Sequence, residues 1–148
     1  MVKVRPNPKL VKRLEEEGEL VHVAQEVDWN EEAGAIARRT DELGLPAVMF
    51  DNVKGYPGWR MAAEVMSNTR RVAIGMDMPP NTAARTLASE YLRRTEGPIK
   101  PLLVNTGPCK ENILLGDQAD LFALPAPLIH AGDGGRYLCT WHVTIMKD

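Results

Sequence analysis

The stretch IHAGDGGRYLCTWHVTI, from Ile129 to Ile145, carries the clearest structural signal in the chain. It begins with a polar, glycine-rich turn from Gly132 to Gly135. From Tyr137 onward, β-branched and aromatic residues alternate with other side chains, which is typical of a loop that leads into a strand. The sequence then ends at Asp148, with no turn and no partner strand. We therefore expect a strand from Tyr137 to Ile145 whose pairing depends on residues outside this chain.

Upstream, helical and strand patterns alternate. Leu10, Val11 and Leu14 form one apolar stripe among charged residues, which predicts a helix from Pro8 to Glu17 that ends at Gly18. The patterns further predict strands over 20–27, 46–50 and 59–65, a turn over 51–58, and helices over 29–43, over 68–76 and from 81 or 82 to 94.

Two helix starts are predicted from their capping residues. Asp28 and Glu31 have the spacing of a capping box. Asn81 or Thr82 follows a Pro-Pro pair and can cap the next helix. The apolar faces of these two helices are expected to bury Ala33, Ile36, Ala37 and Thr40, and Ala84, Leu87, Ala88, Tyr91 and Leu92. The core is expected to hold Ile36, Val48, Phe50, Leu87 and Leu92.

The character of the sequence changes near Gly97, where the helical period disappears. Segments rich in proline and glycine then join predicted strands over 102–104, 112–115 and 137–145. This predicts an α/β class, with an amino-terminal α/β layer domain over residues 1–96 and the first strands of an all-β element over 97–148.

Composition excludes several classes of partner. The 18 basic and 20 acidic residues give a net charge of −2, so neither nucleic acid nor an anionic membrane is expected to bind. No apolar run approaches the roughly 20 residues of a membrane helix. Cys109 and Cys139 lack metal-ligand spacing, and we interpret them as reduced thiols that pack as small side chains.

A few polar residues invite chemical roles. His130 and Asp133 could form a metal or acid–base pair, but in a loop this spacing does not bring them to one face, and we favour a structural turn in which Asp133 binds backbone amides. Three carboxylates are interpreted as solvated turn residues, and His22 as an exposed residue on a strand. The three carboxylates are Glu111, Asp117 and Asp120.

Short segments along nearly the whole chain together resemble one known family. They are Leu14–Val21, Glu26–Asp28, Pro46–Gly55, Arg71–Gly75, Gly107–Asn112, Gly116–Leu121 followed by Leu124-Pro125, and Asp133–Tyr137. In this order they resemble the amino-terminal region of the UbiD family of decarboxylases, whose members are much longer than this chain. The block Asp133–Tyr137 is most similar to the branch of ferulic and cinnamic acid decarboxylases.

The resemblance implies a fold and a function. It implies that the all-β element is the start of an incomplete split β-barrel that binds prenylated flavin mononucleotide (prenylated FMN). It also implies a cytoplasmic, homo-oligomeric carboxy-lyase that removes or adds carboxylate on α,β-unsaturated or aromatic acids. Mn²⁺ and K⁺ would bind at the flavin phosphate. Their ligands, and the residues that transfer protons, would lie beyond Asp148, so the resemblance assigns this chain no catalytic and no metal-binding residue.

Thr140 is the one candidate cofactor-binding residue. By its sequence alone it is a β-branched strand residue whose hydroxyl is satisfied locally. The resemblance instead places it beside the flavin, where a hydroxyl can donate or accept a hydrogen bond without bringing a charge. The residues after it, Trp141 and His142, stand where relatives often have an aromatic residue and then glycine. His142 departs from that pattern and is given no role.

Two hypotheses about the whole protein remain open. In the first, the chain is the amino-terminal portion of a UbiD-type decarboxylase. In the second, it is a non-catalytic subunit or remnant that completes its barrel with another chain, through the open strand at Tyr137 to Ile145. Intact mass and the length of the reading frame separate them, and we favour the first.

The 148-residue chain alone is expected to be inactive. Because the metal ligands and proton donor are expected elsewhere, it should release no carbon dioxide from cinnamic-type or hydroxybenzoic acids at any flavin concentration. The measurement is a carbon dioxide release assay on purified protein. Turnover by material whose mass is confirmed as this chain would contradict the expectation.

Overall fold

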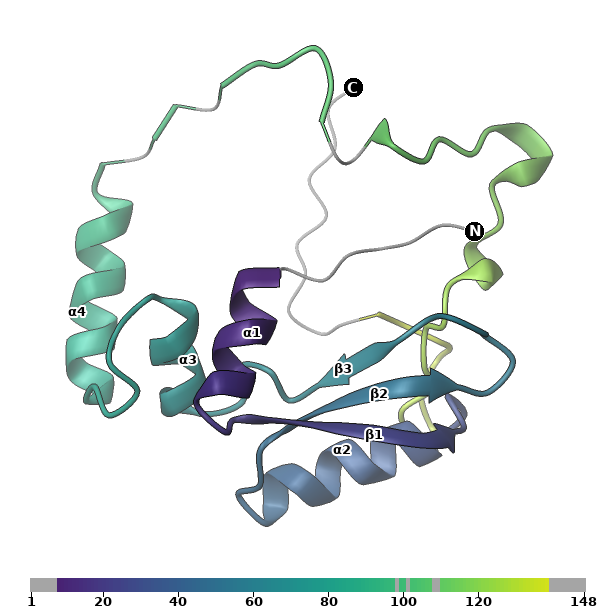
Figure 1. The fold of residues 1–148 in the computed structure, drawn as a ribbon, viewed down its shortest axis with the longest axis horizontal. Coiled ribbons are helices and arrows are strands. Elements are labelled where there is room, and N and C mark those ends of the chain that lie inside the picture. The colour runs from purple at the N-terminus through teal and green to yellow at the C-terminus, as the bar shows by residue number, and fades with distance from the viewer. Residues whose placement is uncertain (1–7, 98, 101, 108–109, 139–148) are drawn as a thin grey trace. The chain divides into compact units, whose positions relative to one another are not determined.

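The computed structural model describes residues 8–97, 99–100, 102–107 and 110–138 (Figure 1). By its internal contacts the chain forms two compact units, which are described separately. One unit combines Met1–Leu20 with Val65–Asp120, and the other combines Val21–Glu64 with Leu121–Asp148. The two segments of each unit are therefore distant in sequence.

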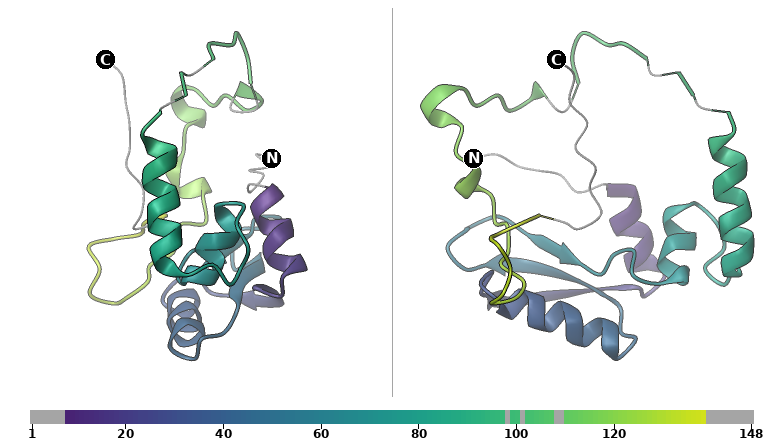
Figure 2. Two further views of the ribbon diagram at one scale, coloured as in Figure 1. Left: turned by 90° about the vertical axis from the view of Figure 1, so that its left-hand side faces the viewer. Right: turned by 180° about the vertical axis from the view of Figure 1, so that it is seen from behind.

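The second unit is built on a three-stranded sheet with the order β1-β2-β3. The strands are β1 (Leu20–Val27), β2 (Ala47–Val53) and β3 (Met61–Ala63). In Figure 1, β1 and β2 run in the same direction, as expected for strands joined through a helix. β3 is antiparallel to β2. The connecting helix α2 (Glu32–Glu42) lies against one face of the sheet, as Figures 1 and 2 show.

The core of this unit lies between α2 and the sheet. Val27, Ala33, Val48 and Phe50 form a buried apolar cluster. Partly buried side chains pack around it, among them Ile36 on α2. The predicted burial of Val48 and Phe50 is confirmed, and Ile36 borders the core.

The start of α2 differs from the prediction. The helix begins at Glu32, and Glu31 has a left-handed backbone (φ 67°) with no side-chain capping bond. The carboxylate of Glu32, rather than that of Glu31, accepts a hydrogen bond from the backbone N–H of Asp28, at 2.6 Å. The backbone N–H of Glu31 instead donates to the carbonyl of Leu128, at 2.8 Å. Because of this long-range pairing, the helix begins only at Glu32, and the predicted capping box is wrong.

The ends of β2 and β3 also differ from the prediction. β2 continues to Val53, through residues predicted as a turn, because its end stays paired with β1: the N–H of Lys54 donates to the carbonyl of Val27, at 2.9 Å. β3 is limited to three residues of the predicted 59–65 strand. Glu64 has a left-handed backbone (φ 61°), which breaks the extended chain.

The first unit contains three helices, α1 (Pro8–Glu16), α3 (Thr69–Gly75) and α4 (Ala84–Thr95). α1 packs against α3. Gly18 follows α1 with φ of 69°, which confirms its predicted role as the residue that ends the helix. The predicted helix over 68–76 is also confirmed, and the side chain of Asn68 caps it by accepting from the N–H of Arg71, at 2.9 Å.

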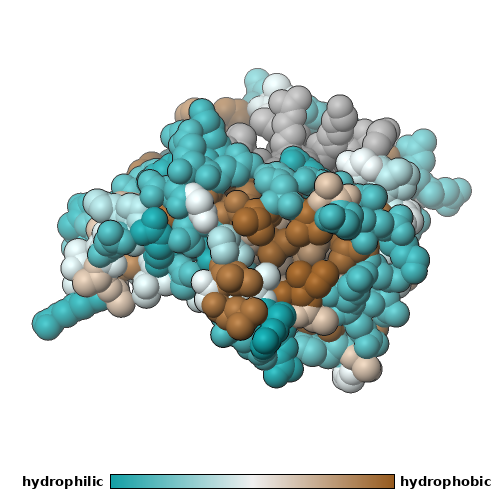
Figure 3. All heavy atoms as spheres, turned by 60° about the horizontal axis from the view of Figure 1, so that its bottom comes forward, coloured by the Kyte–Doolittle hydropathy of each residue, from teal (hydrophilic) through white to brown (hydrophobic). Residues whose placement is uncertain are grey.

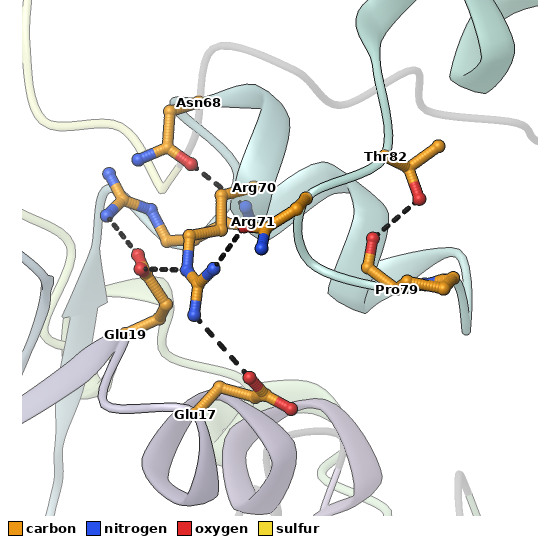
Figure 4. Close-up of polar contacts among 8 residues, drawn as sticks. Glu17, Glu19, Asn68, Arg70, Arg71, Pro79 and Thr82 are labelled. Carbon is orange, nitrogen blue, oxygen red and sulfur yellow. Dashed lines mark hydrogen bonds and ion pairs between the residues drawn. The ribbon is translucent and has the colours of Figure 1, made fainter.

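A buried arginine connects α3 with the residues between α1 and β1 (Figure 4). Arg71 is only 1% exposed, and its guanidinium donates to the carboxylate of Glu19, at 3.2 Å, and to the hydroxyl of Ser67. Arg70 donates to the same carboxylate, at 2.6 Å. Because a buried charge is costly unless it is paired, this network fixes α3 relative to Glu19.

α4 is capped and buried differently from the prediction. Thr82 donates its hydroxyl to the carbonyl of Pro79, at 2.6 Å, and Asn81 accepts from Arg70, so neither side chain caps the helix. Leu87 is buried as predicted, but Leu92 is 62% exposed and is not a core residue. Helical periodicity shows which face can be buried, whereas burial also needs a neighbouring element. Ala84, Ala88 and Tyr91 are exposed as well.

The strands predicted over 102–104 and 112–115 are absent from the described chain. Apart from short 3-10 turns, among them η2 (Gly116–Gln118) and η3 (Leu121–Ala123), the described part of 99–123 is irregular. Strands need partners for their backbone groups, and no described segment pairs with these residues. Of the predicted strand at Tyr137 to Ile145, the first two residues are irregular and the remainder lies outside the described residues.

Apolar side chains remain on the surface. On the face drawn in Figure 3 they gather near the centre, with hydrophilic residues around them. Large exposed apolar side chains include Leu102, Leu103, Ile113, Leu115, Leu121 and Phe122.

None of the helices in the described ranges combines the length and the apolar character that crossing a membrane requires.

The segment that follows η3 approaches α2 at Gly34. A Cβ atom on Gly34 would lie 2.5 Å from the carbonyl oxygen of Ile129 and 2.9 Å from its Cα. No side chain fits there without moving the backbone. Glycine is therefore required on this face of α2.

Leu87→Ala should destabilise the protein by about 2–5 kcal/mol, because it removes a buried side chain and leaves a cavity. Leu92→Ala is the matched control on the same helix, and it should change stability by less than about 0.5 kcal/mol. Denaturant unfolding of both variants measures the difference. Equal small effects would show that the Leu87 face of α4 is not buried.

Gly34→Ala should destabilise the protein by about 1–3 kcal/mol, because the added methyl group overlaps the backbone of Ile129. Gly134→Ala is the control, since a Cβ atom there meets nothing within 4 Å. Thermal unfolding of both variants is the measurement. If Gly34→Ala is as stable as Gly134→Ala, the contact between α2 and Ile129 is absent in solution.

Candidate functional site

The second unit contains a pocket of about 530 Å³. Its floor is apolar and combines residues of α2, β2 and β3, while the segment after η3 supplies another wall. Phe50 belongs to both the core and this floor. The floor includes Ala33, Ala37, Phe50, Met61 and Ala63, and the wall includes Pro127, Ile129, His130, Tyr137 and Leu138.

The rim of the pocket is mainly acidic. Asp41, Glu42 and Glu64 contribute three carboxylates, against the single guanidinium of Arg38. The Nε of Arg38 donates to Glu42, at 2.9 Å, and together with Arg39 it lowers the pKa of the Glu42 carboxyl. An excess of negative charge disfavours a phosphate. The residues of this rim therefore do not fit the phosphate group of a flavin.

His130, Asp133 and Tyr137 form a small polar cluster at the wall of the pocket. The Asp133 carboxylate accepts from the backbone N–H of His130, at 2.9 Å, which confirms that it binds a loop amide. The Nδ1 of His130 lies 3.6 Å from the same carboxylate, so the expectation that the loop spacing keeps these two side chains apart is wrong. Burial, the charge of Asp133 and a hydrogen bond to it raise the pKa of the Tyr137 hydroxyl. The Tyr137 hydroxyl therefore stays protonated at neutral pH and donates a hydrogen bond to Asp133.

Arg136 is the most extensively bonded side chain in this segment. Its guanidinium lies over the ring of Trp29, 4.0 Å from the ring centre, with the rings of Tyr56 and Phe122 at 5.5 and 5.9 Å. Its Nε donates to the carbonyl of Ala126, at 2.6 Å. Its Nη2 donates to the carbonyl of Leu124, at 3.1 Å, and to the Tyr56 hydroxyl, at 2.7 Å.

Sequence reasoning missed this arrangement. It placed Arg136 in the Asp133–Tyr137 block and gave neither Arg136 nor Trp29 a role. The only available signal was the position of an arginine after two glycines, which does not reveal its partners. They come from residues 29, 56 and 122–126, which only the fold brings together.

Backbone pairing supports the same attachment. Asn30 and Leu128 form an isolated parallel bridge, in which the N–H of Leu128 donates to the carbonyl of Trp29, at 3.1 Å. The N–H of Tyr137 donates to the carbonyl of Pro127, also at 3.1 Å. The segment from Leu124 to Tyr137 thus folds back on itself beside the start of α2.

The other predicted candidates lie apart from the pocket. His22 is exposed, as predicted, and its Nδ1 lies 2.7 Å from a carboxylate oxygen of Asp51. Glu111, Asp117 and Asp120 are exposed, in line with their interpretation as turn carboxylates.

Thr140 and both cysteines lie outside the described residues, as do Trp141 and His142. Within the described ranges, no three His, Cys, Asp or Glu side chains are grouped as a metal site would need.

Comparison with known families gives two matches in order along the chain. Residues 11–91 match the 3-octaprenyl-4-hydroxybenzoate carboxy-lyase N-terminal domain. Residues 102–148 match the Rift-related domain of the same carboxy-lyase. Both are domains of UbiD proteins.

Curated relatives agree with these matches. Pyrrole-2-carboxylic acid decarboxylase of Pseudomonas aeruginosa is 38% identical, over 93% of this chain and 30% of its own length. Ferulic acid decarboxylase 1 of Saccharomyces cerevisiae is 32% identical, over 90% of this chain and 29% of its own length. The chain thus spans about 30% of the length of these relatives.

Solved structures show the same relationship. Vanillic acid decarboxylase of Sedimentibacter hydroxybenzoicus, in an open form, has a TM-score of 0.78 and 33% identity, covering 86% of this chain and 28% of that one. An evolved dimeric form of the UbiD-class enzyme HmfF from Pelotomaculum thermopropionicum, in complex with prenylated FMN, has a TM-score of 0.72 and 28% identity, covering 86% and 29%. Since sequence, domain order and fold agree, this chain belongs to the UbiD family of carboxy-lyases.

Proposed function

We propose that this chain is the amino-terminal part of a UbiD-like decarboxylase that acts on an α,β-unsaturated or aromatic carboxylic acid with prenylated FMN. The observation that carries the proposal is the ordered match to both UbiD domains. The names of the relatives support the substrate class, because pyrrole-2-carboxylic, ferulic and vanillic acids all join a carboxylate to an unsaturated or aromatic system. The prenylated FMN held by HmfF supports the cofactor.

The proposed enzyme has a domain boundary near residue 97. Residues 1–96 form the amino-terminal α/β domain, and 97–148 begin a split β-barrel that holds the flavin. The limits of the two domain matches, 91 and 102, support a boundary between them. The two compact units divide the described chain differently, because each joins an early segment to a late one.

Thr140 is the flavin contact that we assign to this chain. In the proposed enzyme, the prenylated flavin supplies the reactive centre for loss or addition of carbon dioxide. Mn²⁺ and K⁺ would bind its phosphate through residues that the proposal places beyond Asp148. The enzyme would be a cytoplasmic homo-oligomer, and the dimeric form of HmfF supports an oligomer.

The described residues have a supporting part in this proposal. The cluster around Arg136 holds the segment that leads to Thr140, and the apolar floor of the pocket fixes α2 against β2 and β3. Tyr137 stays protonated at neutral pH, because burial and the charge of Asp133 raise its pKa. None of these residues moves a proton of the substrate in this scheme.

Thr140→Val should weaken flavin binding by about 1–3 kcal/mol, because it keeps the shape of the side chain and leaves a flavin polar group unpaired. Side chains alternate along a strand, so Cys139 would point to the opposite face, and Cys139→Ser should leave binding nearly unchanged. The measurement is a flavin titration of both variants in the complete enzyme. Equal affinities for Thr140→Val and the wild type would remove this contact.

The intact mass of the natural protein tests the rest of the proposal. A mass well above that of 148 residues, together with a bound flavin in the absorption spectrum, is the expected result. A natural polypeptide of this length alone, free of flavin and of a partner chain, would contradict it.

A further inference from the structure

The sheet of the second unit ends at β1 on one side. The strand order is β1-β2-β3, so β2 is the only strand in the described chain that pairs with β1 (Figure 1). Most side chains from Val21 to Glu26 are exposed, and Val21 is 43% exposed although it is apolar. A strand at the edge of a sheet directs backbone hydrogen-bonding groups toward any segment that lies beside it.

β1 lacks the features that usually protect an edge strand from pairing with another chain. Such features include proline, lysine and a short length. From Val21 to Val27 the sequence is VHVAQEV, which has no proline and no lysine, and Glu26 is its one carboxylate. With eight residues, β1 is the longest strand of the sheet in the described chain, whereas β3 at the opposite edge has only three. The edge at β1 is therefore the better place for the addition of a strand.

The hydrogen bonds of β1 show which of its backbone groups face outward. The carbonyl of Val27 accepts from the N–H of Lys54, so it points toward β2. The N–H and C=O groups of one residue point to the same side of a strand, and this side alternates from residue to residue. His22, Ala24 and Glu26 therefore direct their backbone groups to the open edge.

We propose that the open edge of β1 is an interface, at which a second copy of this chain adds the same strand in antiparallel orientation. A two-fold axis through Ala24 and perpendicular to the sheet places Ala24 opposite Ala24 of the second copy. His22 then lies opposite Glu26 of the second copy, and the seven residues from Val21 to Val27 are all paired. Two three-stranded sheets become one sheet of about six strands, which is a common size.

This register satisfies the geometry of β1. Residues that direct their backbone groups outward meet residues that do the same, as hydrogen-bonded antiparallel pairs require. Opposite side chains also lie on one face of the sheet. Val23 packs toward the core beside α2, so His22 and Glu26 both lie on the other face, where Nδ1 of His22 contacts Asp51.

The side chains of β1 are complementary to themselves in this register. His22 and Glu26 face each other twice, once on each side of the axis, and cross-strand pairs of opposite charge stabilise a sheet. Val21 meets Val27, which covers part of its exposed surface. A register shifted by two residues would place Glu26 opposite Leu20 and lose both charge pairs. Charge complementarity thus favours a second copy, in the register centred on Ala24.

The inference specifies the contact of the homo-oligomer proposed above, and it rests on that part of the proposed function alone. Neither flavin nor substrate has to be bound for the two strands to pair.

Disulfide cross-linking tests the register in the protein as its gene encodes it, with its native cysteines replaced by serine. Ala24→Cys should join two copies under mild oxidation, because directly opposite Cα atoms lie about 5.5 Å apart, within the range of a disulfide. Glu26→Cys is the matched control. Its two copies would be about 14 Å apart, four residues along the strand, and should not cross-link. Mixed with His22→Cys protein, however, Glu26→Cys should form a mixed dimer.

Sedimentation velocity measures the association itself. Wild-type protein should form dimers or larger assemblies, and Ala24→Pro should weaken this association about tenfold or more. Proline removes the N–H that faces the second copy, while the hydrogen bonds between β1 and β2 remain. Ala24→Thr keeps the N–H and is the matched control, which should associate like the wild type. Circular dichroism checks that each variant is folded.

The outcomes separate the interface from the proposed function. The inference would be overturned if Glu26→Cys alone cross-links as readily as Ala24→Cys, or if folded Ala24→Pro associates like the wild type, while the proposed oligomer would stand. An edge occupied by another strand of the same polypeptide would prevent the Ala24→Cys cross-link and so also overturn it. A monomeric wild type would overturn the inference and the oligomer but leave the decarboxylase function in place. If Ala24→Pro does not fold, the cross-links decide.

Discussion

The burial of β2 is the constraint on which the second unit depends. Val48 and Phe50 pack against Val27 of β1 and Ala33 of α2, so one strand fixes the positions of its neighbour and of the helix. Phe50 also forms part of the pocket floor. α2 then offers Gly34 to the backbone of Ile129, and this close approach is possible only because the helix is already held by the core. The core, the pocket floor and the segment around Ile129 therefore all depend on the same strand and helix, β2 and α2.

Two arginines organise the two units in different ways. Arg71 is buried, and its charge is compensated by the carboxylate of Glu19. Arg136 is only partly buried, and aromatic rings and neutral oxygens surround it instead of carboxylates. The first arrangement fixes a helix in a core, where an unpaired charge would be very costly. The second closes a loop while leaving the guanidinium partly solvated.

The described residues combine an apolar pocket floor with an acidic rim. The rim carries more carboxylates than guanidinium groups, and no metal ligands are grouped within the described ranges. Membership of the UbiD family nevertheless rests on matches along nearly the whole chain.

Local patterns determined most element types. The apolar stripe and Gly18 predicted α1, alternation predicted β1, and the ordered segments identified the family from the sequence alone. Tertiary structure decided the start of α2, the exposure of Leu92, the irregular path of 102–115 and the partners of Arg136. Each of these depends on a group that is distant in sequence. The carbonyl of Leu128 accepts the backbone N–H of Glu31. A strand needs another strand to pair with, and a helix face is buried only where a neighbouring element packs against it. Periodicity and capping signals carry no information about such partners, because only the folded chain brings them into contact.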